Sequence, residues 1–415
     1  ASDVYGLVES CRHFLPIESE NSFELSSSNI FTSQDPEISI LDQSIGENIK
    51  LSREDLRVTN ITTRDIDKQD YDHFLNKEIH ETSEIVSRTI SNYLQPKEII
   101  SLDNLHESIV MNDNQVPPFI MSSLRDKKIK KIIITGMGTC YTAAVAISMF
   151  MRARLRRFMP FILVEPHVAT EGSAFYLQPN MQDTLVIVIA QSGTTVDTNV
   201  YVQMAKERGA MSLAIANKRE GDVTFIVDGT IYIGDGRDIE IAVPSTKTYT
   251  AQVILGYILT LFFATNLAKD SKKKDELIND LNNLRNVESI IQESFRILGE
   301  SSLFDLIGSL GCQHNSWYIV RDNSTNAVCA DEIRIKYSEN CYQSVSSLSL
   351  MEINSSHVKN SFIVIMTESK LENMADNLLR LLNDNNSIIV ISIGSELPKS
   401  FDKYLLSGRI INLNM

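Results

Sequence analysis

The sequence is poor in cysteine, and this shortage limits the kind of protein it encodes. Its 415 residues include five cysteines, and no two of them form a Cys-x-x-Cys pair. An odd and scattered set argues against a disulfide framework and against the common zinc-site spacings. We therefore expect reduced thiols in a cytoplasmic protein, with no metal site and no other cofactor.

Long apolar runs and basic stripes are also missing. The most apolar stretch, residues 253–263, is shorter than a membrane span and follows polar residues, so it predicts a buried core helix and no contact with a membrane. The formal net charge of −14 argues against a nucleic-acid surface. It still allows a phosphorylated ligand, because a local nest of backbone N–H groups binds phosphate inside an acidic protein.

The start of the chain shows no targeting segment. It reads Ala-Ser-Asp-Val over residues 1–4, without an initiator Met and without the basic and apolar regions of a signal peptide. We expect the chain to be a fragment or a processed product of a longer protein.

Apolar strands and helical patterns alternate along the middle of the chain. Residues 71–94 have helical spacing of apolar side chains, and Pro96 ends that pattern. Unbroken apolar strands separated by helices then predict a parallel sheet that is covered on both faces. The strand candidates are residues 131–135, 161–164, 184–189, 211–215 and 230–233.

A second alternating section follows an amphipathic connector that begins near residue 270. Its strand candidates are residues 317–320, 362–366 and 387–392, and its helices are expected near 330–342 and 371–382. Two such units in series suggest an internal duplication. The predicted fold is α/β, with tandem doubly wound parallel-sheet domains at 71–270 and 271–415, preceded by a polar segment at 1–70.

Three strand-to-helix turns of the first section are rich in glycine and hydroxyl groups, at residues 135–141, 191–195 and 243–249. Turns of this kind converge at the carboxyl ends of parallel strands, where ligands bind. In the central turn, Gly193 lets the backbone approach a ligand, and hydroxyls lie beside the N–H groups of a helix N-terminus. The alternative is an ordinary capped helix that follows a core strand.

The nucleotide-binding patterns are incomplete. Gly136 and Gly138 begin a dinucleotide fingerprint, but Tyr141 stands at its third glycine, and no acidic residue follows at the usual distance. The phosphate-loop pattern Gly-x4-Gly-Lys-Ser/Thr is absent. We therefore expect neither a nicotinamide cofactor nor nucleotide hydrolysis.

Taken together, the turns resemble the isomerase part of glutamine–fructose-6-phosphate aminotransferase, also called glucosamine-6-phosphate synthase. The family's Gly-Cys-Gly-Thr-Ser-Tyr is similar to residues 136–141, and its Ser-Gln-Ser-Gly-Glu-Thr-Ala-Asp-Thr is similar to residues 190–198. Its Glu-Ile-Gly-Val-Ala-Ser-Thr-Lys-Ala-Tyr-Thr is similar to residues 240–250. Residues 77–81 resemble the family's linker helix, and residues 1–70 resemble the tail of its glutaminase domain. The resemblance implies two sugar-isomerase domains of flavodoxin-like type.

The resemblance also implies a sugar-phosphate pocket and its ligands. Ser192 and Thr195 would bind the phosphate of fructose 6-phosphate, glucosamine 6-phosphate or a related hexose phosphate, and the chain would form a homodimer. Two serines of the family are replaced by Ala190 and Cys140, which removes hydroxyl donors. The pocket residues implied are Thr139, Cys140, Gln191, Ser192, Gly193, Thr195 and Ser245.

The second section contains the helix that resembles the family's catalytic helix. Residues 330–342 align without gaps to Ala-Leu-Glu-Gly-Ala-Leu-Lys-Leu-Lys-Glu-Ile-Ser-Tyr, and Glu332, Lys336 and Glu339 are kept. Their spacing of i, i+4 and i+7 places them on one helix face. The resemblance implies that Glu339 moves a proton between C1 and C2 while an ammonium stabilises the enolate-like intermediate. The alternative is an ordinary Glu–Lys helix pair.

One departure from the family affects ring opening. Ser355 stands where the family has the histidine that opens the sugar ring, and His357 lies slightly beyond. Serine does not exchange protons near neutral pH as imidazole does. His357 is therefore the candidate acid–base residue if the loop is shifted.

Three functions follow as expectations. The first is the isomerase portion of a glucosamine-6-phosphate synthase, acting in amino-sugar and UDP-N-acetylglucosamine synthesis, without glutaminase activity in this chain. The second is a sugar-phosphate-binding sensor or regulatory protein that kept the pocket and lost acid–base residues. The third is a stand-alone phosphosugar isomerase or deglycase, which the missing ring-opening residue disfavours.

Overall fold

The computed structural model describes residues 13–14, 22–24, 39–42, 47–50, 57–58, 66–96, 101–219, 221–298, 301–322, 325–355, 358–392 and 394–414. Its contacts divide the chain into two compact units, Ala1–Asp70 and Tyr71–Met415. In the first unit, β1 (His13–Phe14) pairs with β5 (Arg57–Val58), and β2 (Ser22–Glu24), β3 (Ser39–Asp42) and β4 (Glu47–Lys50) form an antiparallel sheet. Most of the expected glutaminase-domain tail lies outside the described residues.

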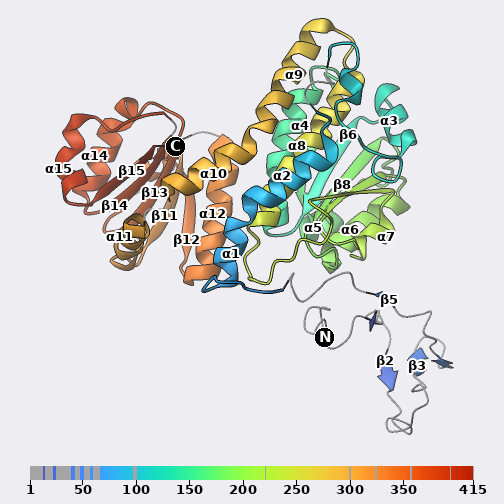
Figure 1. Cartoon of the computed structure of the whole chain (residues 1–415), viewed down its shortest axis with the longest axis horizontal. Helices are drawn as coiled ribbons and strands as arrows, with labels where there is room; N and C mark the ends of the chain where they lie inside the picture. The colour runs from blue at the N-terminus through green and yellow to red at the C-terminus, as the bar shows by residue number, and fades with distance from the viewer. Residues whose placement is uncertain are drawn as a thin grey trace. The chain divides into compact units, whose positions relative to one another are not determined.

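A parallel sheet forms the centre of the first α/β domain. Its order is β10-β9-β8-β6-β7, in which β6 to β10 are numbered along the chain (Figure 1). This is the flavodoxin-like order 2-1-3-4-5, whose ligand crevice lies between the first and third strands. The bounds are β6 (Lys131–Gly136), β7 (Leu163–Val168), β8 (Thr184–Ala190), β9 (Met211–Ala216) and β10 (Gly229–Tyr232).

Both faces of this sheet are buried because successive apolar side chains point to opposite sides. On one face, Ile132 and Ile187 pack in a cluster with helices α2 (Thr82–Tyr93), α4 (Thr139–Leu155) and α8 (Lys247–Leu267). On the other face, Ile133 and Val188 pack with helix α6 (Val196–Glu207). Every residue of β8 is buried, which confirms the strand predicted from its unbroken apolar run.

Helices on the two faces complete this domain. The long helices are α2 (Thr82–Tyr93), α4 (Thr139–Leu155), α6 (Val196–Glu207) and α8 (Lys247–Leu267). The shorter ones are α1 (Phe74–His80), η4 (Leu105–Glu107), α3 (Pro118–Arg125), α5 (Ala169–Glu171), η5 (Gly172–Tyr176) and α7 (Val223–Ile226). The helix expected at 71–94 is therefore present as α1 and α2, which meet at Glu81.

Helix α8 contains the apolar run that predicted a core helix. The helix extends beyond that run to 21 residues, and its length and composition would allow it to cross a membrane. However, 67% of its most apolar window is buried inside the protein, and its side chains belong to the cluster beneath the first sheet. These contacts are those of a core helix.

The second sheet repeats the topology of the first. Its order is β12-β11-β13-β14-β15, which is again 2-1-3-4-5 with all neighbours parallel (Figure 1). Two α/β domains with five parallel strands each confirm the predicted fold class. The strands are β11 (Trp317–Arg321), β12 (Val345–Ser349), β13 (Phe362–Thr367), β14 (Ser387–Ser392) and β15 (Ile410–Asn414).

The connector and the second set of helices occupy the remaining described chain. Helix α9 (Ser271–Arg285) begins at Asp270, whose carboxylate accepts the N–H of Lys272 at 2.8 Å. Helix α12 (Thr325–Cys341) follows β11 and packs against α4 of the first domain. The other helices are α10 (Val287–Leu298), α11 (Ser301–Cys312), α12 (Thr325–Cys341), α13 (Leu350–Ser355), η6 (Leu371–Met374), α14 (Ala375–Asn383), η7 (Lys399–Phe401) and α15 (Asp402–Leu406).

Candidate functional site

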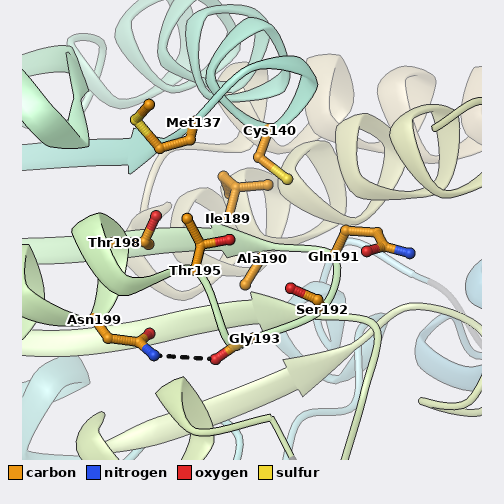
Figure 2. Close-up of a pocket in the computed structure, with 10 residues that line it drawn as sticks. All are labelled: Met137, Cys140, Ile189, Ala190, Gln191, Ser192, Gly193, Thr195, Thr198 and Asn199. Carbon is orange, nitrogen blue, oxygen red and sulfur yellow. Dashed lines mark hydrogen bonds between the residues drawn. The ribbon is translucent and has the colours of Figure 1, made fainter. Parts of the chain in front are cut away.

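A small pocket lies at the crevice between β6 and β8, where the strand order reverses. It has a volume of about 80 Å³. One wall comes from the start of α4 and the other from the turn between β8 and α6 (Figure 2). The lining residues are Met137, Cys140, Ile189, Ala190, Gln191, Ser192, Gly193, Thr195, Thr198 and Asn199. The pocket is therefore where this topology places a ligand.

The structure brings most of the predicted pocket residues together. Cys140, Gln191, Ser192, Gly193 and Thr195 all line the pocket. Thr139 and Ser245 are not among its lining residues. The ligand-binding role of all seven residues stays a prediction.

Sequence reasoning missed three polar or sulfur-containing lining residues. Met137 precedes α4, and Thr198 and Asn199 lie on the first turn of α6. Positions three and four residues apart share a helix face, so helical spacing from Thr195 could have identified Thr198 and Asn199.

The turn after β8 presents hydroxyl groups at the start of α6. Thr195 is the N-cap residue of α6, yet its side chain makes no cap hydrogen bond, and it extends into the pocket (Figure 2). Ser192 Oγ accepts hydrogen bonds from the N–H and the hydroxyl of Thr194, at 3.3 and 3.1 Å. A helix N-terminus with nearby hydroxyls favours an anionic group.

A pair of glycines fixes the shape of this turn. Gly193 has φ of +74°, a left-handed conformation that favours glycine. A Cβ atom added to Gly221 would lie 2.8 Å from the Cα of Gly193 and 2.9 Å from the carbonyl oxygen of Ser192. The two loops therefore touch backbone to backbone.

Hydrogen bonds hold the Gly193 carbonyl in place. It accepts the N–H of Val223 at 3.0 Å and the side-chain amide of Asn199 at 3.3 Å (Figure 2). Both donors come from outside the turn, one from α7 and one from α6. The carbonyl is thus fixed by the protein itself.

Cys140 forms part of the pocket wall as a neutral thiol. Burial raises its pKa to about 11, while a contact from the Gln252 amide at 3.7 Å works in the opposite direction. The nucleophilic form of cysteine is the thiolate. At neutral pH the Cys140 side chain therefore forms part of the pocket wall and is a weak hydrogen-bond partner. It does not act as a nucleophile.

Thr139 connects the first domain to the predicted catalytic helix. Its hydroxyl donates to Glu332 Oε1 at 3.1 Å and accepts from Lys336 Nζ at 2.8 Å. Thr142 donates its hydroxyl to the other oxygen of Glu332. The first turn of α4 and the middle of α12 are thus joined by a buried polar cluster.

The three charged residues of α12 lie close together but differ in exposure. Lys336 Nζ lies 3.1 Å from Glu332 Oε1 and 3.2 Å from Glu339 Oε2. The Glu332 side chain is 8% exposed, whereas that of Glu339 is 36% exposed. Glu332 is therefore positioned to hold α12, and Glu339 is open to a reactant. His357 lies outside the described residues.

Ser245 belongs to a turn that is held from within the protein. Its hydroxyl lies 2.7 Å from that of Thr248. The buried Glu240 accepts the N–H groups of Thr246 and Thr248 at 2.8 and 3.1 Å, so it caps the start of α8.

Helix α1 and the residue that follows it support the same turn. Glu78 accepts the N–H groups of Ile241 and Ala242 at 2.6 and 3.2 Å. Lys247 Nζ donates to Glu81 at 2.5 Å. Ser245 is thus placed by buried carboxylates of two segments.

No metal centre is suggested by the described part of the chain. Within those residues, no three His, Cys, Asp or Glu side chains gather in a way that could hold a metal ion.

Comparison with known proteins agrees with this geometry. Residues 123–262 match the model of the SIS domain family. A glutamine–fructose-6-phosphate aminotransferase of Fusobacterium nucleatum is 33% identical over 233 residues, which are 55% of this chain and 34% of that protein. One from Clostridium tetani is 35% identical over 212 residues, 51% of this chain and 31% of that protein. The chain thus spans about a third of the length of these relatives.

A solved structure extends the likeness to both domains. The C-terminal domain of glucosamine-fructose-6-phosphate aminotransferase from Francisella tularensis superposes with a TM-score of 0.66 at 22% identity. The match covers 84% of this chain and 90% of that one, so it shows the shared fold. The chain therefore carries a SIS domain and is homologous to the isomerase domains of glutamine–fructose-6-phosphate aminotransferases.

Proposed function

We propose that the chain binds a hexose phosphate and serves as the isomerase portion of a glucosamine-6-phosphate synthase. The observation that carries this proposal is the pocket at the β6–β8 crevice, with the Thr195 hydroxyl and the start of α6 on its wall. Sugar-phosphate binding is also the role that homology to SIS domains supports. The ligands we propose are fructose 6-phosphate and glucosamine 6-phosphate.

The size of the pocket suits a phosphate group. Its volume of about 80 Å³ is well below the ~300–1,000 Å³ of pockets that enclose a whole small molecule. We expect the phosphate to enter the pocket while the sugar lies outside it. The relevant donors are hydroxyls and N–H groups, which is the chemistry that phosphate oxygens accept.

The chemistry we propose for α12 is proton transfer between C1 and C2 of the sugar. Glu339 is the base, because its carboxylate is exposed and lies beside Lys336. Lys336 supplies positive charge that stabilises an enolate-like intermediate. Glu332 acts on Lys336 and Thr139 by positioning them, since its two oxygens are already hydrogen-bonded within the protein.

A direct assay tests the enzymatic proposal. The chain is mixed with fructose 6-phosphate, and interconversion with glucose 6-phosphate is followed for the wild type and for Glu339→Gln. We expect turnover in the wild type and its loss in the variant, with unchanged ligand binding. Equal turnover in both proteins would exclude Glu339 as the base.

The second candidate function is a sugar-phosphate sensor without turnover. Two observations favour it: Ser355 stands at the position of the family's ring-opening histidine, and Thr139 is engaged by Glu332 and Lys336. Ligand-induced thermal stabilisation without interconversion would support the sensor. No thermal shift with any hexose phosphate would exclude both functions.

We further propose that the protein is cytoplasmic and homodimeric, and that the complete enzyme supplies amino sugar for UDP-N-acetylglucosamine. Light scattering at micromolar concentration tests the dimer, and a monomeric mass would contradict it.

A further inference from the structure

The two sheets have the same strand order, so each has a point at which that order reverses, where ligands bind in sheets of this kind. In the first sheet this point lies between β6 and β8, at the pocket, and in the second it lies between β11 and β13. We call the position between β11 and β13 the second crevice. The turn that follows β13 is thus the counterpart of the phosphate-pocket turn that follows β8. Asp322 is the first residue after β11, and Thr367 is the last residue of β13.

In the second crevice, the carboxylate of Asp322 accepts several hydrogen bonds. Asp322 Oδ2 accepts the hydroxyl of Thr367 at 2.5 Å and the N–H groups of Glu368 and Ser369, each at 3.2 Å. Its other oxygen accepts the side-chain amide of Asn326 at 3.1 Å. A hydroxyl and two consecutive N–H groups around one anionic oxygen are the type of contact that binds phosphate.

The electrostatics agree with an ionised carboxylate held in this turn. Partial burial pushes the pKa of Asp322 upward, but the hydrogen bonds from Thr367, Ser369 and Asn326 outweigh it and leave the pKa below its usual range. The first crevice differs in this respect. Among the ten described residues that line it, none is acidic.

We propose that Asp322 is a built-in substitute for a phosphate group, which occupies the anion-binding turn of the second sheet and restricts phosphate binding to the first. The duplicated fold provides two equivalent crevices. A fixed negative charge fills one of them and repels a second anion, so a chain with two similar domains binds one phosphate group.

Equilibrium dialysis with labelled inorganic phosphate tests this proposal on the full chain. Asp322→Gly removes the carboxylate and frees the donors, and it is expected to bind one equivalent of phosphate more than the wild type. Asp322→Asn keeps an oxygen in the turn and is expected to gain none. Glu372→Gln removes one negative charge from the exposed start of η6, so it is the control for net charge and should also gain none.

A second substitution tests whether the gained phosphate uses the predicted donors. Adding Thr367→Val to Asp322→Gly removes the hydroxyl and should weaken the additional binding while leaving the remaining binding unchanged. Thermal melts verify folding, and Asp322→Ser replaces the glycine variant if that variant does not fold.

The proposal is overturned if folded Asp322→Gly and Asp322→Ser bind no more phosphate than the wild type. It is also overturned if Asp322→Asn gains as much as Asp322→Gly, because charge removal alone would then suffice. Binding is counted relative to the wild type, so the outcome does not depend on whether the first crevice binds a sugar phosphate.

Discussion

At the residue scale, the proposed binding of phosphate in the pocket depends on individual hydroxyl groups. Thr195 is the N-cap residue of α6 by its backbone position, and its side chain lines the pocket without a cap hydrogen bond. Its hydroxyl is therefore available to a ligand, which is what a phosphate site at this helix N-terminus would require.

Thr195→Val is expected to weaken fructose 6-phosphate binding about 10- to 100-fold, because a hydrogen bond to a charged group contributes about 1.5–3 kcal/mol. Calorimetric titration measures the change. Thr170→Val is the control, since Thr170 is exposed and does not line the pocket. A similar loss in both variants would contradict a specific role of the Thr195 hydroxyl.

Substitution of the two α12 carboxylates, Glu332 and Glu339, is expected to lower the free energy of unfolding by different amounts. Glu332→Gln disturbs a buried carboxylate that three groups contact, so we expect the free energy of unfolding to fall by about 1–3 kcal/mol. Glu339→Gln removes a more exposed partner of Lys336, so its cost should stay below about 1 kcal/mol. Urea unfolding measures both, and equal costs would contradict the assignment of Glu332 as a positioning residue.

The thiol of Cys140 predicts a pH dependence. Its raised pKa of about 11 keeps it protonated at pH 8, where an exposed thiol is already partly ionised. Cys312 is exposed, so peptide mapping should show iodoacetamide on Cys312 first. Labelling of Cys140 should rise only as the pH approaches 11, and rapid labelling near pH 8 would contradict a buried neutral thiol.

Contacts between neighbouring loops determine the pocket at the element scale. The turn after β8 is held by α6 and by the segment before α7, through the Gly193 carbonyl and the contact with Gly221. The contacts of Gly193 with Val223 and Gly221 join residues about 30 positions apart in the sequence. The geometry of the anion site therefore depends on residues well beyond the motif itself.

Gly221→Ala is expected to weaken fructose 6-phosphate binding, because the new Cβ atom would lie 2.8 Å from the Gly193 backbone and must displace the turn. Gly308→Ala is the control, since a Cβ atom there meets nothing within 4 Å. Titration calorimetry compares the two variants. Unchanged affinity in a folded Gly221→Ala protein would show that the turn tolerates displacement.

The sequence predicted the central elements better than the peripheral ones. Strands β6, β8 and β13 have unbroken apolar runs because both of their faces are buried. Strands β12 and β15 were not predicted. They form the two edges of the second sheet and contain Ser, Asn and Leu without a continuous apolar run.

Part of the candidate site was likewise beyond sequence reasoning. The central turn was found because Ser192, Gly193 and Thr195 are contiguous with a strand and a helix. The Gly193–Gly221 contact and the Thr139–Glu332 bond join residues far apart in the chain. Tertiary proximity of this kind leaves no spacing pattern in a single sequence.

At the scale of the whole molecule, one sheet topology occurs twice. The two sheets have the same strand order, and their two switch points carry different chemistry. The first is lined by hydroxyls without an acidic side chain among its described residues, while the second holds Asp322. The charged face of α12 meets the start of α4 next to the first crevice.

A crystal structure of the protein with fructose 6-phosphate tests the central claim most directly. The account predicts one phosphate per chain, within hydrogen-bond distance of the Thr195 hydroxyl and of N–H groups at the start of α6. Phosphate density elsewhere in the chain, or none at saturating ligand, would contradict it.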